Sequence, residues 1–291
     1  MPFLNVLTAA QVRQYEQDGY VIVEDVLSSA ELAALRDATD TIIAAARGKT
    51  GHDHIHDLDP AHTPDQPRVR RIKEPHLHHP AYASLVKHPR ILGALTDLWG
   101  PNLRFQYSKL NMKQAGIGAA IEWHQDWAFY PHTNDDLAAV GVMLDDCELD
   151  NGPLLVLPGS HLGPTIDHHW EGKFIAAIHP TASGVDFSKA VPLTGKAGSI
   201  TIHHVRAIHG SAPNRSDRDR RLLLYQHRNA DAWPIRGIPE GWDAWEALML
   251  TGQSTVAPRM EALPVRLPFP QAERQGSLYE NQALMPERFF G

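Results

Sequence analysis

His124 and Asp126 stand two positions apart, and both residue types can bind a metal ion. On a β-strand, residues at i and i+2 point to the same face, so an imidazole nitrogen and a carboxylate oxygen would converge there. His209 offers a third ligand farther along the chain. Two histidines and one carboxylate leave three adjacent positions on a metal open, which is typical of non-haem Fe(II) oxygenases. The spacing therefore predicts an iron site, beside the simpler interpretation of a solvated strand face.

Aromatic side chains surround this pair in the sequence, namely Trp123, Trp127, Phe129 and Tyr130. Small-molecule sites are largely apolar clefts with a few polar groups, so these rings predict a pocket wall for an apolar or ring-bearing molecule. We expect Trp127 and Phe129 to contact the substrate.

The chain resembles the phytanoyl-CoA dioxygenase family from its N-terminal helices to about Trp233. The resemblance rests on three motifs: His124-Gln125-Asp126, the segment 151–161 (NGPLLVLPGSH), and His209-Gly210-Ser211 with Asn214 and Arg220. Members of this family are Fe(II)- and 2-oxoglutarate-dependent oxygenases on a double-stranded β-helix, or jelly roll. The resemblance implies that iron binds His124, Asp126 and His209, and that 2-oxoglutarate and O2 are co-substrates.

The resemblance also assigns an anchor for the distal carboxylate of 2-oxoglutarate. Arg220, eleven residues after His209, matches the family's arginine, and a guanidinium suits a carboxylate because it binds it through two hydrogen bonds and stays charged. Arg221 is the competing candidate, but strand alternation places the two arginines on opposite faces. Ser211 matches a hydroxyl that touches the same carboxylate.

Asn111 lies thirteen residues before His124, where related enzymes place a co-substrate contact. Tyr107 and Lys109 share its face by the period of two. Tyr107 is the second candidate for the co-substrate, and Lys109 is a candidate for the substrate.

A basic stretch, 68–73 (RVRRIK), supplies one more candidate. Arg71 or Lys73 matches a basic residue that the family has near the co-substrate, and Arg71 is also a candidate for the substrate. A solvated run of charges is the alternative interpretation.

The resemblance implies the reaction as well. Such an enzyme hydroxylates or otherwise oxidises an unactivated C–H bond of a small organic molecule and releases succinate and CO2. Related halogenases have a small residue in place of the metal carboxylate, so Asp126 favours hydroxylation over halogenation. Two alternatives stay open: another metal enzyme on a cupin-like barrel, such as a hydrolase that uses bound water as its nucleophile, and a small-molecule binder without activity.

Composition limits the partners. The chain has 291 residues, 43% of them hydrophobic, and a net charge of −7 with histidine neutral. A negative charge gives little reason to bind a nucleic acid backbone, and no apolar run approaches the roughly 20 residues of a membrane helix. Cys147 is the single cysteine and is expected to be small, buried and unreactive. We expect a cytoplasmic protein with a small-molecule substrate, and the oligomeric state stays open.

The fold is predicted to be mainly β with flanking helices, around a jelly-roll, cupin-like core. We expect one domain over residues 1–291, with a mostly helical part at 1–100, the core at 101–230 and a wrapping segment at 231–291. Short apolar runs bounded by turn residues predict the strands. They are 104–113, 140–144, 154–157, 199–202 and 222–226.

Three helices are predicted in the first hundred residues. Two capping boxes, Thr8 with Gln11 and Ser28 with Glu31, begin the first two. Pro80 is expected to begin a third that runs to Leu98.

The other histidines and tryptophans have structural interpretations. We expect a loop at 48–67, and its histidines at 52, 54 and 56 are not predicted to bind a metal. We expect His161 to be a hydrogen-bonded core residue and His204 to lie behind the metal ligands. The loop histidines in question are His52, His54 and His56. Three tryptophans near the C-terminus are expected to pack the C-terminal segment: Trp233, Trp242 and Trp245.

Overall fold

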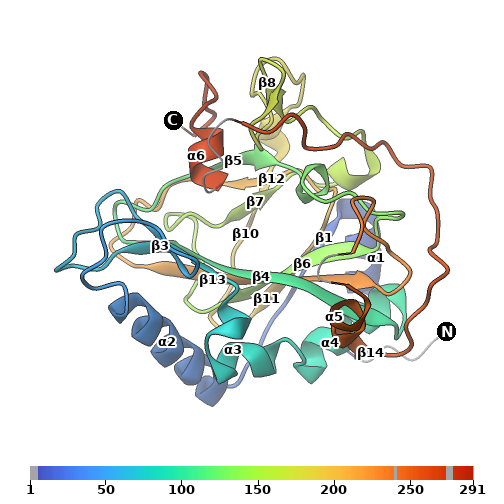
Figure 1. Ribbon diagram of the computed structural model, residues 1–291, viewed down its shortest axis with the longest axis horizontal. Coiled ribbons are helices and arrows are strands. Elements are labelled where there is room, and N and C mark those ends of the chain that lie inside the picture. The colour runs from blue at the N-terminus through green and yellow to red at the C-terminus, as the bar shows by residue number, and fades with distance from the viewer. Residues whose placement is uncertain (1–5, 239–240, 273–277, 291) are drawn as a thin grey trace.

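The N-terminal helices begin where their capping residues predict. The computed structural model describes residues 6–238, 241–272 and 278–290 (Figure 1). Helix α1 (Ala9–Asp18) and helix α2 (Ser29–Ala44) both have complete capping boxes, in which the cap side chain and the third helical residue satisfy each other's backbone N–H groups. Strand β1 (Tyr20–Val23) lies between them.

The predicted third helix is two helices. Helix α3 (Pro80–Leu85) ends before Pro89, and helix α4 (Pro89–Trp99) begins at it. Proline lacks a backbone N–H and is tolerated in the first turn of a helix but not in its interior. Pro89 therefore breaks the predicted segment.

Most strands belong to one large antiparallel sheet. Its order is β1-β11-β6-β13-β4-β3-β2, and β14 also pairs with β4. The strands are β2 (His56–Leu58), β3 (Val69–Lys73), β4 (Leu103–Lys113), β6 (Leu137–Met143), β11 (Ile200–His204), β13 (Arg220–Asn229) and β14 (Met249–Thr251).

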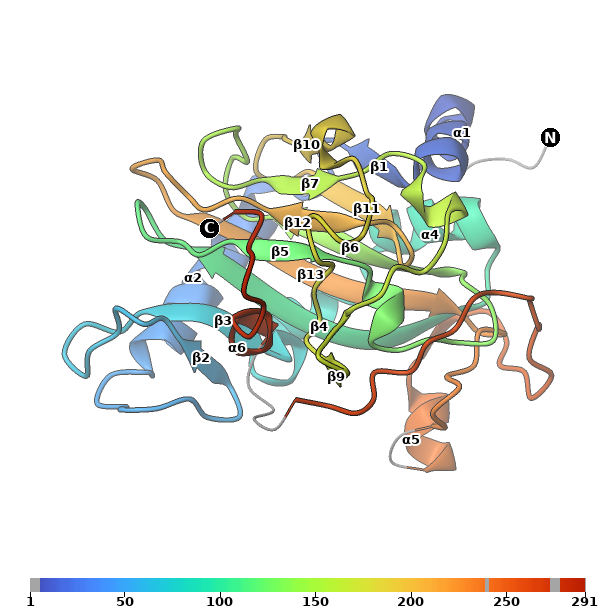
Figure 2. The same ribbon diagram turned by 90° about the horizontal axis from the view of Figure 1, so that it is seen from above.

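A smaller antiparallel sheet lies against the large one, as Figure 2 shows. Its order is β10-β7-β12-β5, and from β4 to β13 the chain passes repeatedly between the two sheets. The strands are β5 (Ile121–His124), β7 (Leu154–Val156), β10 (Val191–Leu193) and β12 (His209–Ser211), and a separate pair is β8 (His169–Trp170) with β9 (Lys173–Phe174). The molecule is mainly β with helices at its periphery, as predicted.

Two strands lie where the sequence predicted a loop and a solvated run. β2 falls inside the predicted loop at 48–67, and β3 contains the basic stretch. Ile72 of β3 is fully buried, and Arg70 is buried as well. The stretch is therefore a strand of the large sheet between β4 and β2, and its charged side chains alternate between the two faces.

The large sheet has two different faces. Its outer face packs on α2, α3 and α4 (Figure 1) through a core that includes Leu35, Ile91 and Leu223. The opposite face carries Leu222 and Leu224 together with polar side chains, and it looks toward the small sheet. The candidate site lies between the two sheets.

The C-terminal part contains helix α5 (Trp242–Ala247), β14 and helix α6 (Leu278–Gln282), and residues 252–270 after β14 form neither helix nor strand. Trp245 is fully buried between the guanidinium groups of Arg104 and Arg228, so it packs this segment rather than covering the site. No helix in the described part of the chain has the length and apolar character to cross a membrane.

Candidate active site

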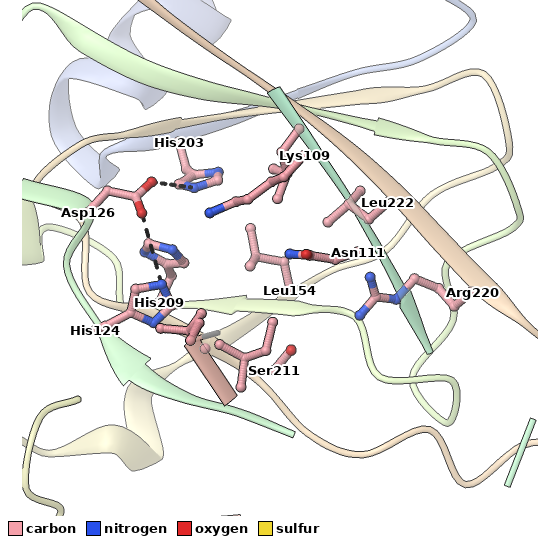
Figure 3. Close-up of a pocket in the computed structure, with 14 residues that line it drawn as sticks. Lys109, Asn111, His124, Asp126, Leu154, His203, His209, Ser211, Arg220 and Leu222 are labelled. Carbon is pink, nitrogen blue, oxygen red and sulfur yellow. Dashed lines mark ion pairs between the residues drawn. The ribbon is translucent and has the colours of Figure 1, made fainter. Parts of the chain in front are cut away.

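His124, Asp126 and His209 come together at one end of the small sheet. Their ligand atoms all lie within 4.8 Å of one another, and all three residues are buried (Figure 3). His124 ends β5 and His209 begins β12, whereas Asp126 begins a 3-10 turn over Asp126–Ala128. The prediction that His124 and Asp126 share a strand face was therefore wrong in its geometry. The turn, not strand alternation, brings the carboxylate to the histidines.

Backbone carbonyls fix the orientation of both histidine rings. The Nδ1–H of His124 donates to the Glu122 carbonyl at 2.8 Å, and that of His209 donates to the Ala207 carbonyl at 2.9 Å. A carbonyl only accepts, so each Nε2 keeps its lone pair and faces the other ligands. This is the arrangement of metal-binding histidines, whose second nitrogen is commonly held by a carbonyl or carboxylate. The three side chains fit a divalent metal.

The charges of the site also favour a cation. Burial and the neighbouring His209 lower the pKa of His124 well below its ordinary value, so its imidazole is neutral and able to bind a metal. Burial alone would raise the pKa of Asp126, but Lys109 and the nearby histidines outweigh it and lower that pKa. The carboxylate is therefore ionised at neutral pH.

His203, rather than His204, lies beside the triad. Its Nε2 is 3.9 Å from Asp126 Oδ2, and its ring centroid is 4.6 Å from that of His209. His204, expected to lie behind the ligands, instead has its ring 5.0 Å from that of His161. Adjacent residues of β11 (Ile200–His204) face opposite sides of the sheet, so His203, opposite Ala139, points toward the small sheet and His204, opposite Ala138, points to the outer core.

A cavity of about 430 Å³ extends from the triad between the sheets. Figure 3 shows Arg220 at the end opposite the histidines, with Asn111 and Ser211 between. Arg220 is buried, and its Nη2 donates to the Gly152 carbonyl at 2.7 Å. All three predicted contacts line this cavity, and its one end carries a guanidinium while the other carries the candidate metal ligands.

Arg221 faces away from the cavity, as strand alternation predicts. Its guanidinium donates to both oxygens of Asp145, at 2.9 and 2.8 Å, and to Asp40 at 3.2 Å. These acids occupy the outer side of the large sheet. Arg220 is therefore the arginine that can reach a ligand inside the cavity.

Glycine is required where the chain passes Arg220. Gly152 has φ +76°, and a Cβ there would lie 2.6 Å from the Ala212 carbonyl oxygen. A side chain at this position would strain the backbone and collide with the neighbouring chain. The close approach of the turn lets the Gly152 carbonyl accept the Arg220 hydrogen bond.

A second cavity, of about 1060 Å³, opens on the other side of the triad. Lys109, His124, Asp126 and Leu278 line both cavities, so the triad lies at their junction. Most of its lining residues carry polar groups, and of the four aromatic residues predicted for the wall, Phe129 and Tyr130 line it. The other lining residues are Arg71, Gln106, Tyr107, Phe129, Tyr130, Gln226 and Asn281.

Two predicted contacts are placed differently from the prediction. Tyr107, predicted at the co-substrate, lines the second cavity and not the first. Trp127, predicted at the substrate, lines neither, because the 3-10 turn directs it into a core with Leu137 and Val205. Its Nε1–H donates to the Pro264 carbonyl at 2.9 Å. Phe129 lines the second cavity as predicted.

Of the two basic candidates on β3, only Arg71 reaches a cavity. Its Nη2 lies 2.5 Å from Asp57 Oδ2, and Lys73 Nζ lies 3.1 Å from the other oxygen of the same carboxylate. Asp57 is almost fully buried. Arg71 therefore shares one buried carboxylate with Lys73.

Gln226 is a site residue that sequence reasoning missed. Its Nε2 donates to Asp126 Oδ2 at 3.4 Å and to the Tyr130 hydroxyl at 2.5 Å. The signal was available, because Gln226 lies on the same face of β13 as Arg220 by the period of two. Gln226 holds the carboxylate from the side of the second cavity.

The histidines of the predicted loop have structural partners. His56 is buried between the Asp53 carboxylate and the Ile42 carbonyl, and His52 lies 3.0 Å from Glu280. Across residues 6–238, 241–272 and 278–290, the triad is the one group of three or more side chains placed to hold a metal. His161 is buried, and its Nε2 lies 3.1 Å from the Glu16 carbonyl oxygen, as expected for a core histidine.

Comparison with known proteins gives relatives that span most of the chain. A probable alpha-ketoglutarate-dependent hypophosphite dioxygenase of Stutzerimonas stutzeri is 37% identical over 97% of this chain and 99% of its own length. An L-proline trans-4-hydroxylase of Streptomyces griseoviridis is 30% identical over 79% and 90%. The crystal structure of EctD from S. alaskensis with bound Fe has the same fold, with a TM-score of 0.65 and 23% identity over 89% of this chain and 88% of that one.

The relatives and the triad agree on Fe(II) and 2-oxoglutarate as cofactor and co-substrate, and on dioxygenase activity. The family model for phytanoyl-CoA dioxygenase (PhyH) matches residues 15–222. This stretch contains all three candidate ligands and Arg220. The chain is therefore a member of the phytanoyl-CoA dioxygenase family.

Proposed function

We propose that this dioxygenase hydroxylates, or otherwise oxidises, an unactivated C–H bond of a small organic molecule and releases succinate and CO2. The position of the triad at the junction of two cavities carries the proposal. A reaction between a co-substrate and a separate substrate needs two compartments that meet at one metal. The first cavity suits the co-substrate, because Arg220 closes its far end.

The residues of the candidate site have distinct roles in this proposal. His124, Asp126 and His209 hold Fe(II), and the metal supplies the oxidation chemistry. Arg220 pairs with the distal carboxylate of 2-oxoglutarate, and Ser211 and Asn111 contact the same molecule. The chain's own contribution is to orient the reactants and to exclude water between the sheets.

The substrate occupies the second cavity, beside Lys109, Arg71 and Phe129. The relatives' names, which include hypophosphite, ectoine and proline, support a small molecule and do not select one. Because hypophosphite has P–H rather than C–H bonds, oxidation of a P–H bond is a second candidate. The 37% identity to that relative favours testing it.

We further infer that the chain forms one domain whose core is a double-stranded β-helix. The sheet orders β11-β6-β13-β4 and β10-β7-β12-β5 support this, because consecutive strands alternate between the sheets except at β7 and β10. That alternation is how a jelly roll is wound.

Two alternative functions would leave some of the site residues without a role. A hydrolase on a cupin-like barrel would use the triad but not Arg220, Ser211 or Asn111. An inactive binder would need none of the metal ligands. Asp126 supports hydroxylation over halogenation, because its carboxylate occupies the position that a halide would need.

The test begins with the purified protein under anaerobic conditions. Fe(II) and then 2-oxoglutarate are added, and the visible absorbance band of a keto acid bound to Fe(II) is recorded. We expect a band that Arg220→Ala loses at the same concentrations and Arg221→Ala retains. Iron binding without a band would favour the hydrolase, and absence of iron binding would contradict the site. Succinate formation with candidate substrates then tests turnover.

A further inference from the structure

Lys109 is a cation without a partner at the junction of the two cavities. It has no hydrogen bond or ion pair with any residue of the part of the chain that the structure describes. Figure 3 shows its ammonium group directed toward the triad. A charge held between two sheets is costly unless it is paired. Asp126 acts on the ammonium group through its charge but makes no ion pair with it, so an anion in direct contact with Lys109 would stabilise it.

The other charged residues that line the two cavities do not form an ion pair with Lys109. Among the described residues that line either cavity, Asp126 is the one carboxylate, and it is a candidate metal ligand. Arg71, the other cation of the second cavity, is already paired with Asp57. A metal at the triad would draw the charge of Asp126 away from Lys109.

The second cavity also offers a hydrogen-bond donor. The Tyr107 hydroxyl lines this cavity and has no hydrogen bond with another described residue. Burial raises the pKa of Tyr107, so this hydroxyl keeps its proton. The Tyr130 hydroxyl accepts from Gln226 and shares its proton with Asp126, so it is already engaged. A hydroxyl donor beside an ammonium group suits the oxygens of a small anion.

We propose that the substrate carries an oxyanion group, such as a carboxylate or a phosphinate, and that Lys109 binds this group within the second cavity. This inference rests on the proposed function and adds the chemical class of its substrate. Lys109 would hold the anion beside the metal, so that the bond to be oxidised lies next to the triad. The competing role for Lys109 is to bind 2-oxoglutarate from the first cavity, which it also lines.

The experiment measures small oxyanions on the anaerobic complex with Fe(II) and 2-oxoglutarate. Hypophosphite and formate are the anionic probes, and formamide is the neutral probe of similar size. Binding is followed by calorimetry and by the change in the visible absorbance band. The variants are Lys109→Met, Lys109→Arg, and Lys189→Met, which removes the same charge from an exposed residue.

We expect Lys109→Met to weaken the binding of both anions about tenfold or more, while 2-oxoglutarate affinity stays within about threefold. Lys109→Arg keeps most of the anion affinity, and Lys189→Met keeps all of it. Anions that fail to bind the wild-type complex, bind Lys109→Met equally well, or bind no better than formamide would overturn the proposal. So would a loss of 2-oxoglutarate affinity without loss of anion affinity. Failure of the proposed function is distinct, because the absorbance band would then be missing before any anion is added.

Discussion

His124 and His209 lie directly opposite each other on strands β5 and β12, and their ring centroids are 4.1 Å apart. Each ring is held by a backbone carbonyl two residues earlier in the chain. Two of the three ligands therefore depend on a single strand pair. The register of that pair sets the distance between them.

Replacing any one ligand is expected to abolish the reaction. His124→Ala, Asp126→Ala and His209→Ala each leave two ligands, too few to hold iron in a defined geometry. Iron content and 2-oxoglutarate-dependent succinate formation are the measurements. His54→Ala, an exposed residue of the histidine-rich stretch, serves as the control and should retain full activity. Wild-type succinate formation in any ligand variant, with iron occupancy verified, would contradict the assignment.

The neighbouring arginines give a matched pair of variants. Arg220→Ala should weaken 2-oxoglutarate binding on the order of 100-fold, because it removes a buried charged donor from the co-substrate cavity. Arg221→Ala should leave that affinity unchanged, since its guanidinium binds Asp145 on the other side of the sheet. Its expected effect is a lower melting temperature. Equal losses of 2-oxoglutarate affinity in the two variants would refute the assignment of Arg220.

Acid should destabilise the metal-free protein through its buried histidines. His132 Nδ1–H donates to the Tyr130 carbonyl, and its Nε2 accepts from Arg228, which can only donate. Burial and Arg228 lower the pKa of His132 to about 3. Below about pH 6.5 the unfolded chain therefore takes up a proton that the folded chain refuses. The free energy of unfolding falls by about 1.4 kcal/mol per pH unit for each such group.

Urea unfolding between pH 7 and pH 5 measures this slope. Burial lowers the pKa of His204 to about 3 and that of His168 to about 4, so they add to it, whereas burial raises the pKa of Asp136 to about 6 and partly opposes it. His132→Gln should reduce the slope by about one proton. A slope that does not change in this variant would show that His132 is protonated in the folded protein.

Gln226 is expected to set the orientation of Asp126 rather than its ability to bind iron. Gln226→Leu removes both hydrogen bonds while leaving the three ligands in place, so iron content should stay near that of the wild type and turnover should fall about tenfold. Tyr130→Phe tests the second bond of the same group. A double variant less impaired than the sum of the two would show that they act together. Loss of iron in Gln226→Leu would instead assign it a role in metal retention.

Strand alternation predicted side-chain direction wherever a strand continued without a break. It separated Arg220 from Arg221 and placed Asn111 and Lys109 on one face of β4, because β4 and β13 run unbroken past the cavities. The ligand types were predictable from chemistry alone.

The failures occur where a strand ends. β5 stops at His124, so alternation could not place Asp126 or Trp127, and the 3-10 turn sends the indole into the core. His203 and His204 both lie within β11, so in their case alternation itself assigns His203 to the face of the triad. The ion pair of Arg71 with Asp57 could not be predicted either, because Asp57 lies on β2, within the segment that was predicted to be a loop. These outcomes depend on contacts between distant segments.

The two sheets carry different parts of the candidate site, and this has a consequence for local unfolding. The candidate iron ligands belong to the small sheet or its adjoining turn, whereas Arg220 and Asn111 belong to β13 and β4 of the large sheet. A molecule of 2-oxoglutarate that reaches from the metal to Arg220 would connect the small sheet to the large sheet. Iron alone should then slow amide hydrogen exchange mainly in β5 and β12, and the keto acid should extend that protection to β4 and β13.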